Sequence, residues 1–306
     1  MKQNCLTYGC LVTGGAGFIG SHVVDALVED GWNTIILDNL SGGKGENVNK
    51  KAKLVIGDIN NTNLVKQLIH DNDIKYIFHL AALPRIHRSI SEPLETHSAN
   101  VTGTLNLLNV AREFKIRKFI YSSSSSVYGK QNVPEMVETM DCSPLSPYAL
   151  QKYQGEQYGF IFNKLFKIPF VALRYFNVWG NRQVTEGPYA LVIGKFLEQK
   201  KRDESLTIYG DGKSTRSYTY VGDVARANIL AMEKDLIMPI AINIGQTKET
   251  SVNKIAELIG GKSKYIIPNP RGEFEERRKC ANIDKAKRLL GWEPTVNVED
   301  GILNKI

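Results

Sequence analysis

The stretch that decides the fold is Thr13-Gly14-Gly15-Ala16-Gly17-Phe18-Ile19-Gly20. It follows an apolar run from Cys10 to Thr13 and opens a segment in which Ile19, Val23, Ala26 and Leu27 recur at helical spacing. Glycine permits a tight turn, close approach of the backbone to a phosphate, and contact between helix and strand. A glycine triplet alone is equally compatible with a flexible loop. A strand before it and a helix after it favour a dinucleotide site.

Apolar runs of strand length alternate with segments of helical period over the first 175 residues. The predicted strands are Cys10 to Thr13, Thr34 to Leu37, Leu54 to Ile56, Tyr76 to Leu80, Phe119 to Ser122 and Phe170 to Leu173. This alternation predicts a Rossmann-like, doubly wound α/β fold around a parallel sheet. We expect residues 1–175 to form that domain. Residues 176–306 are expected to form a smaller C-terminal α/β domain that binds substrate, with part of 220–246 returning to the first domain.

The C-terminal part has more glycine and proline and shorter elements, including helices expected around Gly187 to Gln199 and Tyr220 to Lys234. A smaller domain over the carboxyl ends of the strands would create a crevice between the two parts. Open α/β sheets bind their ligands there.

Composition excludes several classes of protein. The chain has 306 residues, 42% of them hydrophobic and 23% charged, which suits about two ordinary globular domains. The net charge of +7 is spread along the chain, so it favours anionic ligands more than nucleic acid. No apolar stretch approaches the ~18 residues of a membrane span. The four cysteines form no CxxC pair, so we expect neither zinc nor a disulfide framework, and a cytoplasmic location.

Asp38 ends the second predicted strand, 18 residues beyond Gly20. A carboxylate at about this spacing accepts the ribose hydroxyls of an adenosine and repels a 2′-phosphate, which predicts NAD rather than NADP. The alternative is an aspartate that forms a turn before Asn39. Asp58, after the third strand, has the same two interpretations, as a residue at the adenine edge or as a turn residue.

Three further residues suggest chemistry. Tyr148 precedes Lys152 by four residues, so a helix would place both on one face, and Ser124 follows the fifth strand. A nearby cation favours the phenolate over the phenol, so Tyr148 could exchange protons while Ser124 hydrogen-bonds the reacting oxygen. Tyrosine and lysine at this spacing also occur by chance, and five consecutive serines also suit a linker. Their position within a βαβ repeat favours the catalytic interpretation.

Taken together, these features resemble the extended short-chain dehydrogenase/reductase family, and within it the UDP-hexose 4-epimerases. The stretches that carry the resemblance are Thr13 to Ser21, Leu37 to Leu40, His79 to Ala82, Asn100 to Leu105, Ser122 to Gly129, Pro147 to Lys152, Arg174 to Gly180, Gly210 to Val224 and Leu289 to Pro294. They span nearly the whole chain in the family's order.

The resemblance implies a role for each matching position. It implies that the catalytic residues are Ser124, Tyr148 and Lys152. It implies that NAD is lined by Gly14, Gly17, Phe18, Ile19, Gly20, Asp38, Asn39, Asp58, Ile59, Ala81, Ala82, Asn100, Tyr148, Lys152 and Tyr175. The nucleotide sugar is implied to contact Ser124, Ser125, Asn177, Val192, Arg216 and Arg271. A homodimer is implied through helices near Thr102 to Phe114 and Tyr148 to Leu165.

One comparison within the family selects a reaction. The dehydratases and decarboxylases of the family carry acids after the catalytic hydroxyl, whereas this chain reads Ser124-Ser125-Ser126-Val127-Tyr128-Gly129. A hydroxyl cannot replace a carboxylate in those reactions. We therefore expect an NAD-dependent 4-epimerase acting through a 4-keto intermediate. The alternatives are a nucleotide-sugar 4-ketoreductase, a dehydratase or decarboxylase of the same family, or a non-catalytic NAD-binding redox sensor.

The substrate stays open between UDP-glucose with UDP-galactose and their N-acetylated counterparts. Arg88-Ser89-Ile90 and the stretch Gly187 to Ile193 resemble enzymes that act on N-acetylated sugars. Lys279 or Cys280 falls where the family gates sugar size, and lysine there is unusual.

Overall fold

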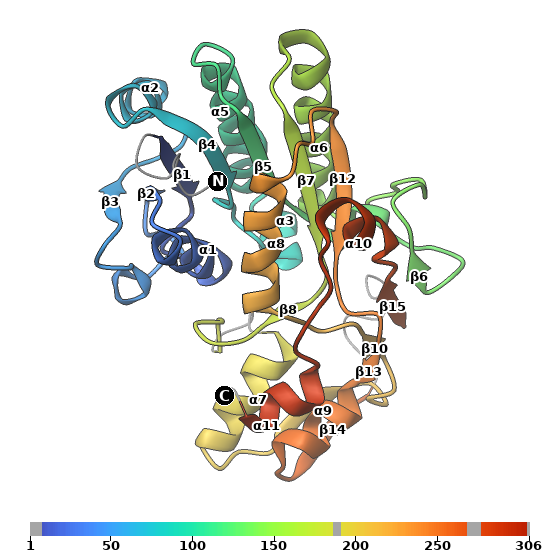
Figure 1. Ribbon diagram of the computed structural model, residues 1–306. Helices are drawn as coiled ribbons and strands as arrows, with labels where there is room; N and C mark the ends of the chain where they lie inside the picture. The colour runs from blue at the N-terminus through green and yellow to red at the C-terminus, as the bar shows by residue number, and fades with distance from the viewer. Residues whose placement is uncertain (1–7, 186–190, 268–276, 305–306) are drawn as a thin grey trace.

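A parallel sheet of seven strands forms the centre of the molecule, as shown in the computed structural model, which describes residues 8–185, 191–267 and 277–304 (Figure 1). In spatial order the strands are β12 (Ile240–Ile244), β7 (Phe170–Tyr175), β5 (Lys118–Ser124), β4 (Ile74–His79), β1 (Gly9–Thr13), β2 (Asn33–Asp38) and β3 (Lys53–Ile56). All six predicted strands are present, and β12 adds a seventh. The expected doubly wound α/β fold is confirmed.

The strand order reverses between β1 and β4. From β1 the chain winds outward through β2 to β3, then returns to β4 and winds the other way through β5 and β7 to β12. Loops that leave the carboxyl ends of strands at such a switch point diverge, and this opens a crevice for ligands. The glycine-rich stretch follows β1 and therefore lies at this point.

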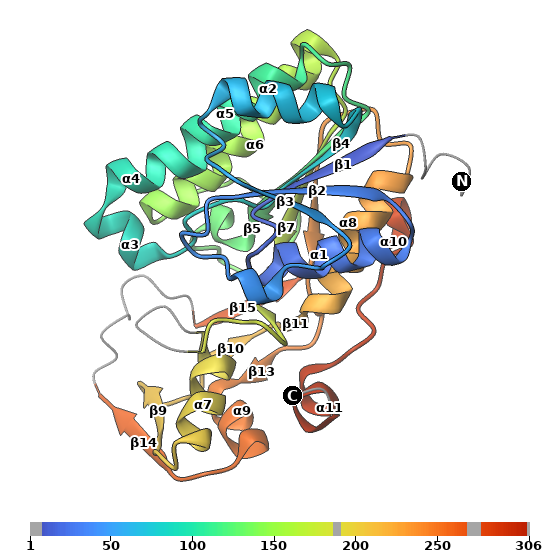
Figure 2. The same ribbon diagram turned by 90° about the vertical axis from the view of Figure 1, so that its left-hand side faces the viewer.

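Helices cover both faces of the sheet (Figure 2). One face carries α1 (Phe18–Glu29), α8 (Val221–Glu233) and α10 (Asp284–Leu290); the other carries α2 (Thr62–Asp71), α5 (Gly103–Ala111) and α6 (Pro147–Phe166). Alternate residues along β5 pack into separate cores, Ile120 on the α8 side and Phe119 on the α6 side. Both faces are thus buried, which explains why the strands are continuously apolar.

Shorter elements precede α5. They are α3 (Ile86–Ser91), α4 (Pro93–His97) and η3 (Ser98–Thr102), a π-helical turn that joins α4 to α5. Between β5 and α6 lie η4 (Ser125–Tyr128) and β6 (Glu135–Met136), and η2 (Gly45–Asn47) follows β2. Residues of η3 and η4 recur in the site described below.

The C-terminal part has its own core, built around Trp179, Phe196, Leu206 and Ile255. Its elements are β8 (Val178–Trp179), α7 (Val192–Lys201), β9 (Leu206–Tyr209), β10 (Thr215–Arg216), β11 (Thr219–Tyr220), β13 (Thr250–Ser251), α9 (Val252–Ile259), β14 (Ser263–Ile266), β15 (Arg278–Ala281) and α11 (Val298–Asn304). The helix expected from Gly187 to Gln199 is described from Val192 and extends to Lys201. The helix expected from Tyr220 to Lys234 is α8.

A buried aspartate attaches the end of the chain to α8. The carboxylate of Asp223 accepts hydrogen bonds from the backbone of Thr295 at 2.9 Å and of Val296 at 3.1 Å, and from the Thr295 hydroxyl at 2.7 Å. The Trp292 indole donates to the backbone carbonyl of Asp223 at 2.8 Å. These bonds fasten residues 292–296 to α8, the helix that covers the large sheet. The chain then continues into α11.

Within the described ranges, we find no helix that combines the length and the hydropathy of a membrane span.

Candidate active site

Gly14 and Gly20 shape the turn between β1 and α1. Gly14 has φ +72°, and a Cβ there would lie 2.6 Å from the backbone nitrogen of Ala81. A Cβ on Gly20 would lie 2.1 Å from the carbonyl oxygen of Gly14. Both positions therefore require glycine for the fold itself, since neither neighbour is a side chain that could move aside.

Gly17 is different, because protein packing alone does not demand glycine there. Its φ is −79°, and a Cβ would meet only the Gly14 carbonyl oxygen, at 3.1 Å. Gly17 is the N-cap of α1 and provides no side-chain cap, so the first-turn amides of Phe18 and Ile19 have no capping partner. Open space in front of uncapped amides fits a pyrophosphate, which helix N-termini bind well. The residues present thus fit a dinucleotide.

Asp38 connects β2 to this turn. Its carboxylate is buried and accepts hydrogen bonds from the backbone nitrogens of Ala16, at 3.0 Å, and Leu40, at 2.8 Å. A carboxylate has about four acceptor positions, so two remain for hydroxyl donors. Both interpretations of Asp38 from the sequence are compatible with this geometry, because Asp38 orders the local turn and still has acceptor capacity for a ribose.

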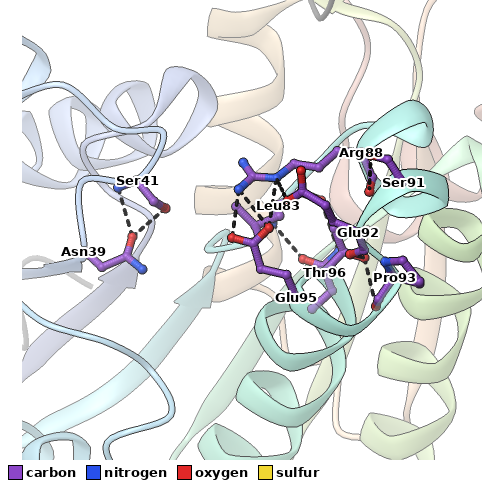
Figure 3. A network of polar contacts seen from close by, with 10 residues as sticks. Asn39, Ser41, Leu83, Arg88, Ser91, Glu92, Pro93, Glu95 and Thr96 are labelled. Carbon is purple, nitrogen blue, oxygen red and sulfur yellow. Dashed lines mark hydrogen bonds and ion pairs between the residues drawn. The ribbon is translucent and has the colours of Figure 1, made fainter.

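Asn39 and Asp58 lie at the outer part of the expected dinucleotide site. The side-chain oxygen of Asn39 accepts hydrogen bonds from the backbone and hydroxyl of Ser41, at 3.1 and 2.7 Å (Figure 3). Asp58 is exposed and accepts from the backbone nitrogen of Asn60 at 2.8 Å, whereas Ile59 is buried. The geometry at Asp58 is that of a turn residue, and a role at the adenine edge stays a prediction.

A chain of hydrogen bonds through His79 holds the loop after β4. The Ala81 amide donates to the Thr13 hydroxyl at 3.3 Å, and that hydroxyl is 2.7 Å from Nδ1 of His79. Nε2 of His79 is 2.8 Å from the Thr104 hydroxyl, which donates to the carbonyl of Asn100 at 2.7 Å. The chain is satisfied when His79 is neutral with its proton on Nε2. Burial, and secondarily the charge of Lys152, lowers the pKa of His79 to about 3.

Asn100 has a definite partner set. It lies in η3, accepts from the Leu83 amide at 2.7 Å, and donates to the Leu83 carbonyl at 3.1 Å and to Oε1 of Gln151 at 2.8 Å. Both of its amide hydrogens are therefore used within the protein. Asn100 fixes the loop that continues from Ala81 and Ala82 and connects it to α6. Its predicted contact with NAD remains untested.

Local sequence explains where α6 begins. Ser146 is the N-cap and accepts from the Ala149 amide at 3.2 Å, while Pro147 occupies the first turn. The Tyr148 amide donates to the hydroxyl of Ser89, a buried residue of α3, at 3.0 Å. Tyr148 is therefore the second residue of a helix whose start is fixed by its cap and by α3.

The three predicted catalytic residues come together at the end of β5. The side chain of Ser124 interacts with that of Tyr148 and acts to lower its pKa. Nζ of Lys152 donates to the carbonyl oxygen of Ser122 at 2.7 Å and lies 5.1 Å from the centre of the Tyr121 ring. The Ser126 hydroxyl donates to Oγ of Ser124 at 2.9 Å. The four-residue spacing on a helix therefore predicted the arrangement correctly.

Burial dominates the electrostatics of Tyr148 and Lys152. Burial raises the pKa of Tyr148, although the hydrogen bond with Ser124 and the charge of Arg85 act to lower it. Burial lowers the pKa of Lys152 to about 7, with Glu156 acting in the opposite direction. Desolvation is thus the larger effect on both groups, and the expectation that a nearby cation favours the phenolate of Tyr148 stays a prediction.

Sequence reasoning missed a buried ion pair behind these residues. Glu156, with no exposed side-chain area, accepts hydrogen bonds from Nε of Arg174 at 2.9 Å and from a terminal nitrogen at 2.7 Å. It also accepts from the Ser123 hydroxyl at 2.5 Å. The Arg174 guanidinium lies 4.7 Å from the centre of the Tyr128 ring. The signal was available, because Glu156 continues the spacing from Tyr148 to Lys152 by four more residues.

Tyr175 and Asn177 lie where β7 leaves the large sheet. Tyr175 is buried, and its hydroxyl donates to Oδ1 of Asn228 on α8 at 2.9 Å. Asn177 has φ +33° and donates to the carbonyl of Ser217 at 3.1 Å, which links the end of the sheet to β10. Tyr175 thus packs into the core beside α8, and Asn177 fixes the crossing into the C-terminal part.

The remaining predicted substrate residues are more dispersed. Ser125 is buried in η4, and Val192 begins α7 against the C-terminal core. Arg216 donates to the backbone carbonyls of Thr215 at 2.8 Å and Arg277 at 3.3 Å. Arg271 lies outside the described residues.

Lys279 and Cys280, the two residues expected to gate the size of the sugar, have different environments in the structure. The buried thiol of Cys280 donates to the Thr247 carbonyl at 2.9 Å. Lys279 pairs with Arg216 in the register of β10 and β15. Across the described ranges, no group of three or more His, Cys, Asp or Glu side chains is arranged to hold a metal ion.

Known proteins resemble this chain over nearly its full length. A family model described as the NAD dependent epimerase/dehydratase family matches residues 10–245. A Methanocaldococcus jannaschii protein, provisionally named a UDP-glucose 4-epimerase, is 42% identical, over 95% of each chain. The UDP-glucose 4-epimerase of Thermotoga maritima, solved with UDP-glucose, superposes with a TM-score of 0.91 at 39% identity, over 97% of each chain.

A third relative carries an acidic sugar. The UDP-glucuronic acid 4-epimerase of Bacillus cereus, solved with UDP-glucuronic acid and NAD, superposes with a TM-score of 0.88 at 32% identity, again over 97% of each chain. The expected family resemblance is confirmed.

Proposed function

The chain belongs to the NAD-dependent epimerase/dehydratase family, and from this premise we propose that it is a 4-epimerase of a UDP-hexose. The observation that carries the proposal is the position of Tyr148 and the buried Lys152 one turn apart on α6, where Lys152 contacts the end of β5, the strand that carries Ser124. The uncapped N-terminus of α1 and the buried Asp38 supply a place for the cofactor at the same end of the sheet.

NAD, held at the N-terminus of α1 and by Asp38, would supply the hydride acceptor and donor for carbon 4 of the sugar. Tyr148 removes the proton from the 4-hydroxyl oxygen in the first half and gives it back in the second. The Ser124 hydroxyl, which interacts with Tyr148, holds the same oxygen. Because burial raises the pKa of Tyr148, its phenolate needs a positive charge nearby, and Lys152 is the buried cation one helical turn away.

We assign the nucleotide sugar to residues 176–306, with residues 1–175 and parts of 220–246 holding NAD. Arg216 and Asn177 lie in the connection between these regions, and an arginine fork suits a diphosphate. Ser124, Ser125 and Val192 are proposed sugar or nucleotide contacts. Arg271 is proposed on the family pattern alone.

Dehydration and decarboxylation, two reactions of related enzymes, are less compatible with the site. Ser126 donates to Ser124, so a hydroxyl stands where a dehydratase or decarboxylase would need a carboxylate. A 4-ketoreductase would use the same catalytic residues but consume NADH. A redox sensor would need no Tyr148 and Lys152 pair.

We also propose a cytoplasmic homodimer. The apolar side chains of Leu150, Ile161 and Leu165 on α6 are 47 to 63% exposed, and a second copy of the chain could cover them. The described cysteines are free thiols, which suits a reducing compartment. Sedimentation of the wild-type chain and of its Ile161→Lys variant tests the interface: a dimer that becomes a monomer supports it, and a monomeric wild type refutes it.

The activity is tested by incubating the purified protein with UDP-glucose, UDP-N-acetylglucosamine and UDP-glucuronic acid, without added NADH. We expect one of them to give its 4-epimer, with NAD copurifying and no net oxidation or reduction. Absence of all three epimers from protein that contains NAD would refute the proposal. Oxidation of NADH by a 4-ketosugar would instead identify a ketoreductase.

A further inference from the structure

Glu156 is a buried acid that the mechanism above does not use. With Tyr148 and Lys152 it forms a row along one face of α6, one residue per turn. Each member of the row interacts with a different serine at the end of β5. The pairs are Tyr148 with Ser124, Lys152 with Ser122, and Glu156 with Ser123.

The carboxylate of Glu156 connects two adjacent strands. One side receives the hydroxyl of Ser123 on β5 at 2.5 Å, and both oxygens receive nitrogens of Arg174 on β7 at 2.9 and 2.7 Å. Ser123 and Arg174 are direct neighbours in the register of the two strands. Charged hydrogen bonds in a dry interior are strong, so this contact fixes the residue immediately before Ser124 against α6.

The charges around Lys152 give Glu156 a second effect. The titratable groups near Lys152 are Tyr148 and Glu156 on α6, Tyr121 on β5 and His79 on β4, with Arg174 on β7 paired to Glu156. Of this set, Glu156 is the one carboxylate, and burial raises the pKa values of both tyrosines. Glu156 therefore opposes the desolvation that drives Lys152 toward its neutral form.

We propose that Glu156 is a positioning residue of this site: it holds the end of β5 that carries Ser124 and keeps Lys152 charged. Its partner Arg174 neutralises the carboxylate and orients it. The inference rests on the proposed function, because it assigns Glu156 to the support of the Tyr148 proton transfer.

The test uses the NAD-containing protein and its Glu156→Gln variant. An amide keeps an acceptor for Ser123 but removes the negative charge. We expect kcat to fall by about 10- to 100-fold with KM changed less than about threefold, and the alkaline limb of the kcat profile to move to lower pH by about 1 to 2 units. A double variant, Glu156→Gln with Arg174→Met, avoids an unpaired buried charge, so it should recover stability without restoring the pH profile.

A second readout needs no turnover. The tyrosinate absorbance of the NAD-containing protein, minus that of its Tyr148→Phe variant, reports the ionisation of Tyr148 directly. We expect this ionisation to move to higher pH by about one unit when Glu156→Gln is added, because Lys152 then loses its charge.

Asp223→Asn is the matched control, since Asp223 is also a buried carboxylate paired with an arginine, but on α8. It should lower stability and leave both pH profiles unchanged. The proposal is overturned if Glu156→Gln, alone or with Arg174→Met, leaves the kcat profile and the Tyr148 titration as in the wild type. If the wild type epimerises no UDP-hexose, the proposed function fails, and the titration alone still decides the role of Glu156.

Discussion

The two ends of the proposed site are built in different ways. Around the sheet, function-bearing residues stand on consecutive turns or strand ends, and their contacts are buried: Asp38 to the Ala16 amide, and Lys152 to the Ser122 carbonyl. In the C-terminal part, the short strands β13, β10 and β15 pair with one another and with β6 of the first part in one small sheet, and Arg216 donates to the carbonyls of Thr215 and Arg277. The proposed cofactor-binding end is formed by turns and strand ends of the large sheet, whereas the proposed sugar-binding end is formed by short segments that are distant in the sequence.

This difference explains what can be learned from each part. Backbone geometry demands particular residues at the sheet, so motifs there identify the cofactor and the reacting groups. Contacts among distant short segments depend on how these segments pack together. A sequence motif in the C-terminal part therefore indicates which region binds the substrate but does not identify the substrate.

The largest effect should come from the reacting group itself. We expect Tyr148→Phe to lower kcat by about 10³-fold or more, because the phenyl ring cannot exchange the proton, while NAD is retained. Turnover and bound NAD are measured on the same preparation. Activity within tenfold of the wild type would remove Tyr148 from the mechanism.

The next effect tests the rigidity of the cofactor end. A Cβ at Gly20 would collide with the Gly14 carbonyl at 2.1 Å, so Gly20→Ala should cost about 3 kcal/mol of unfolding free energy and release NAD. Gly42→Ala is the control, since a Cβ there meets nothing within 4 Å. Urea unfolding and NAD content measure both. Equal unfolding free energies and equal NAD contents of the two variants would show that the turn can accommodate a Cβ at Gly20.

The same contrast appears in what the sequence predicted. Six strands, the glycine turn and the Tyr148 and Lys152 pairing followed from local period and spacing. We expected part of residues 220–246 to return to the first domain, and β12 lies in that range. Its pairing with β7 and the anchoring of residues 295 and 296 by Asp223 did not follow from local period, because both depend on contacts between distant segments. Burial raises the pKa of Tyr148, and residue spacing could not reveal this, because burial is a tertiary property.

A smaller effect tests how the C-terminal pieces are held. Asp223→Asn places an amide group against backbone donors that the carboxylate satisfied, so we expect a loss of about 2 kcal/mol in unfolding free energy. NAD content should not change, because the cofactor end does not rely on these bonds. Loss of NAD in this variant would show that the two ends are coupled more tightly than the comparison implies.

The smallest effect concerns His79 at the cofactor end. The folded state keeps His79 neutral down to about pH 3, whereas the unfolded chain takes up the proton below its ordinary pKa of about 6.5. Stability is therefore lost as the pH falls through this window, by about 1 kcal/mol between pH 6.5 and 5.5. His79→Gln does not titrate and should lose less stability over that step. If the unfolding free energy, measured with urea, depended on pH in the same way for the wild type and for His79→Gln, a neutral His79 would be contradicted.

The most direct test of the central claim follows the hydrogen on carbon 4. A UDP-hexose that the enzyme accepts, labelled with deuterium at carbon 4, is converted in ordinary water by the NAD-containing protein without added NADH. We expect the 4-epimer to keep its deuterium at carbon 4, because the same hydride leaves and returns within the closed site. An epimer that carries hydrogen from water at carbon 4 would contradict the account.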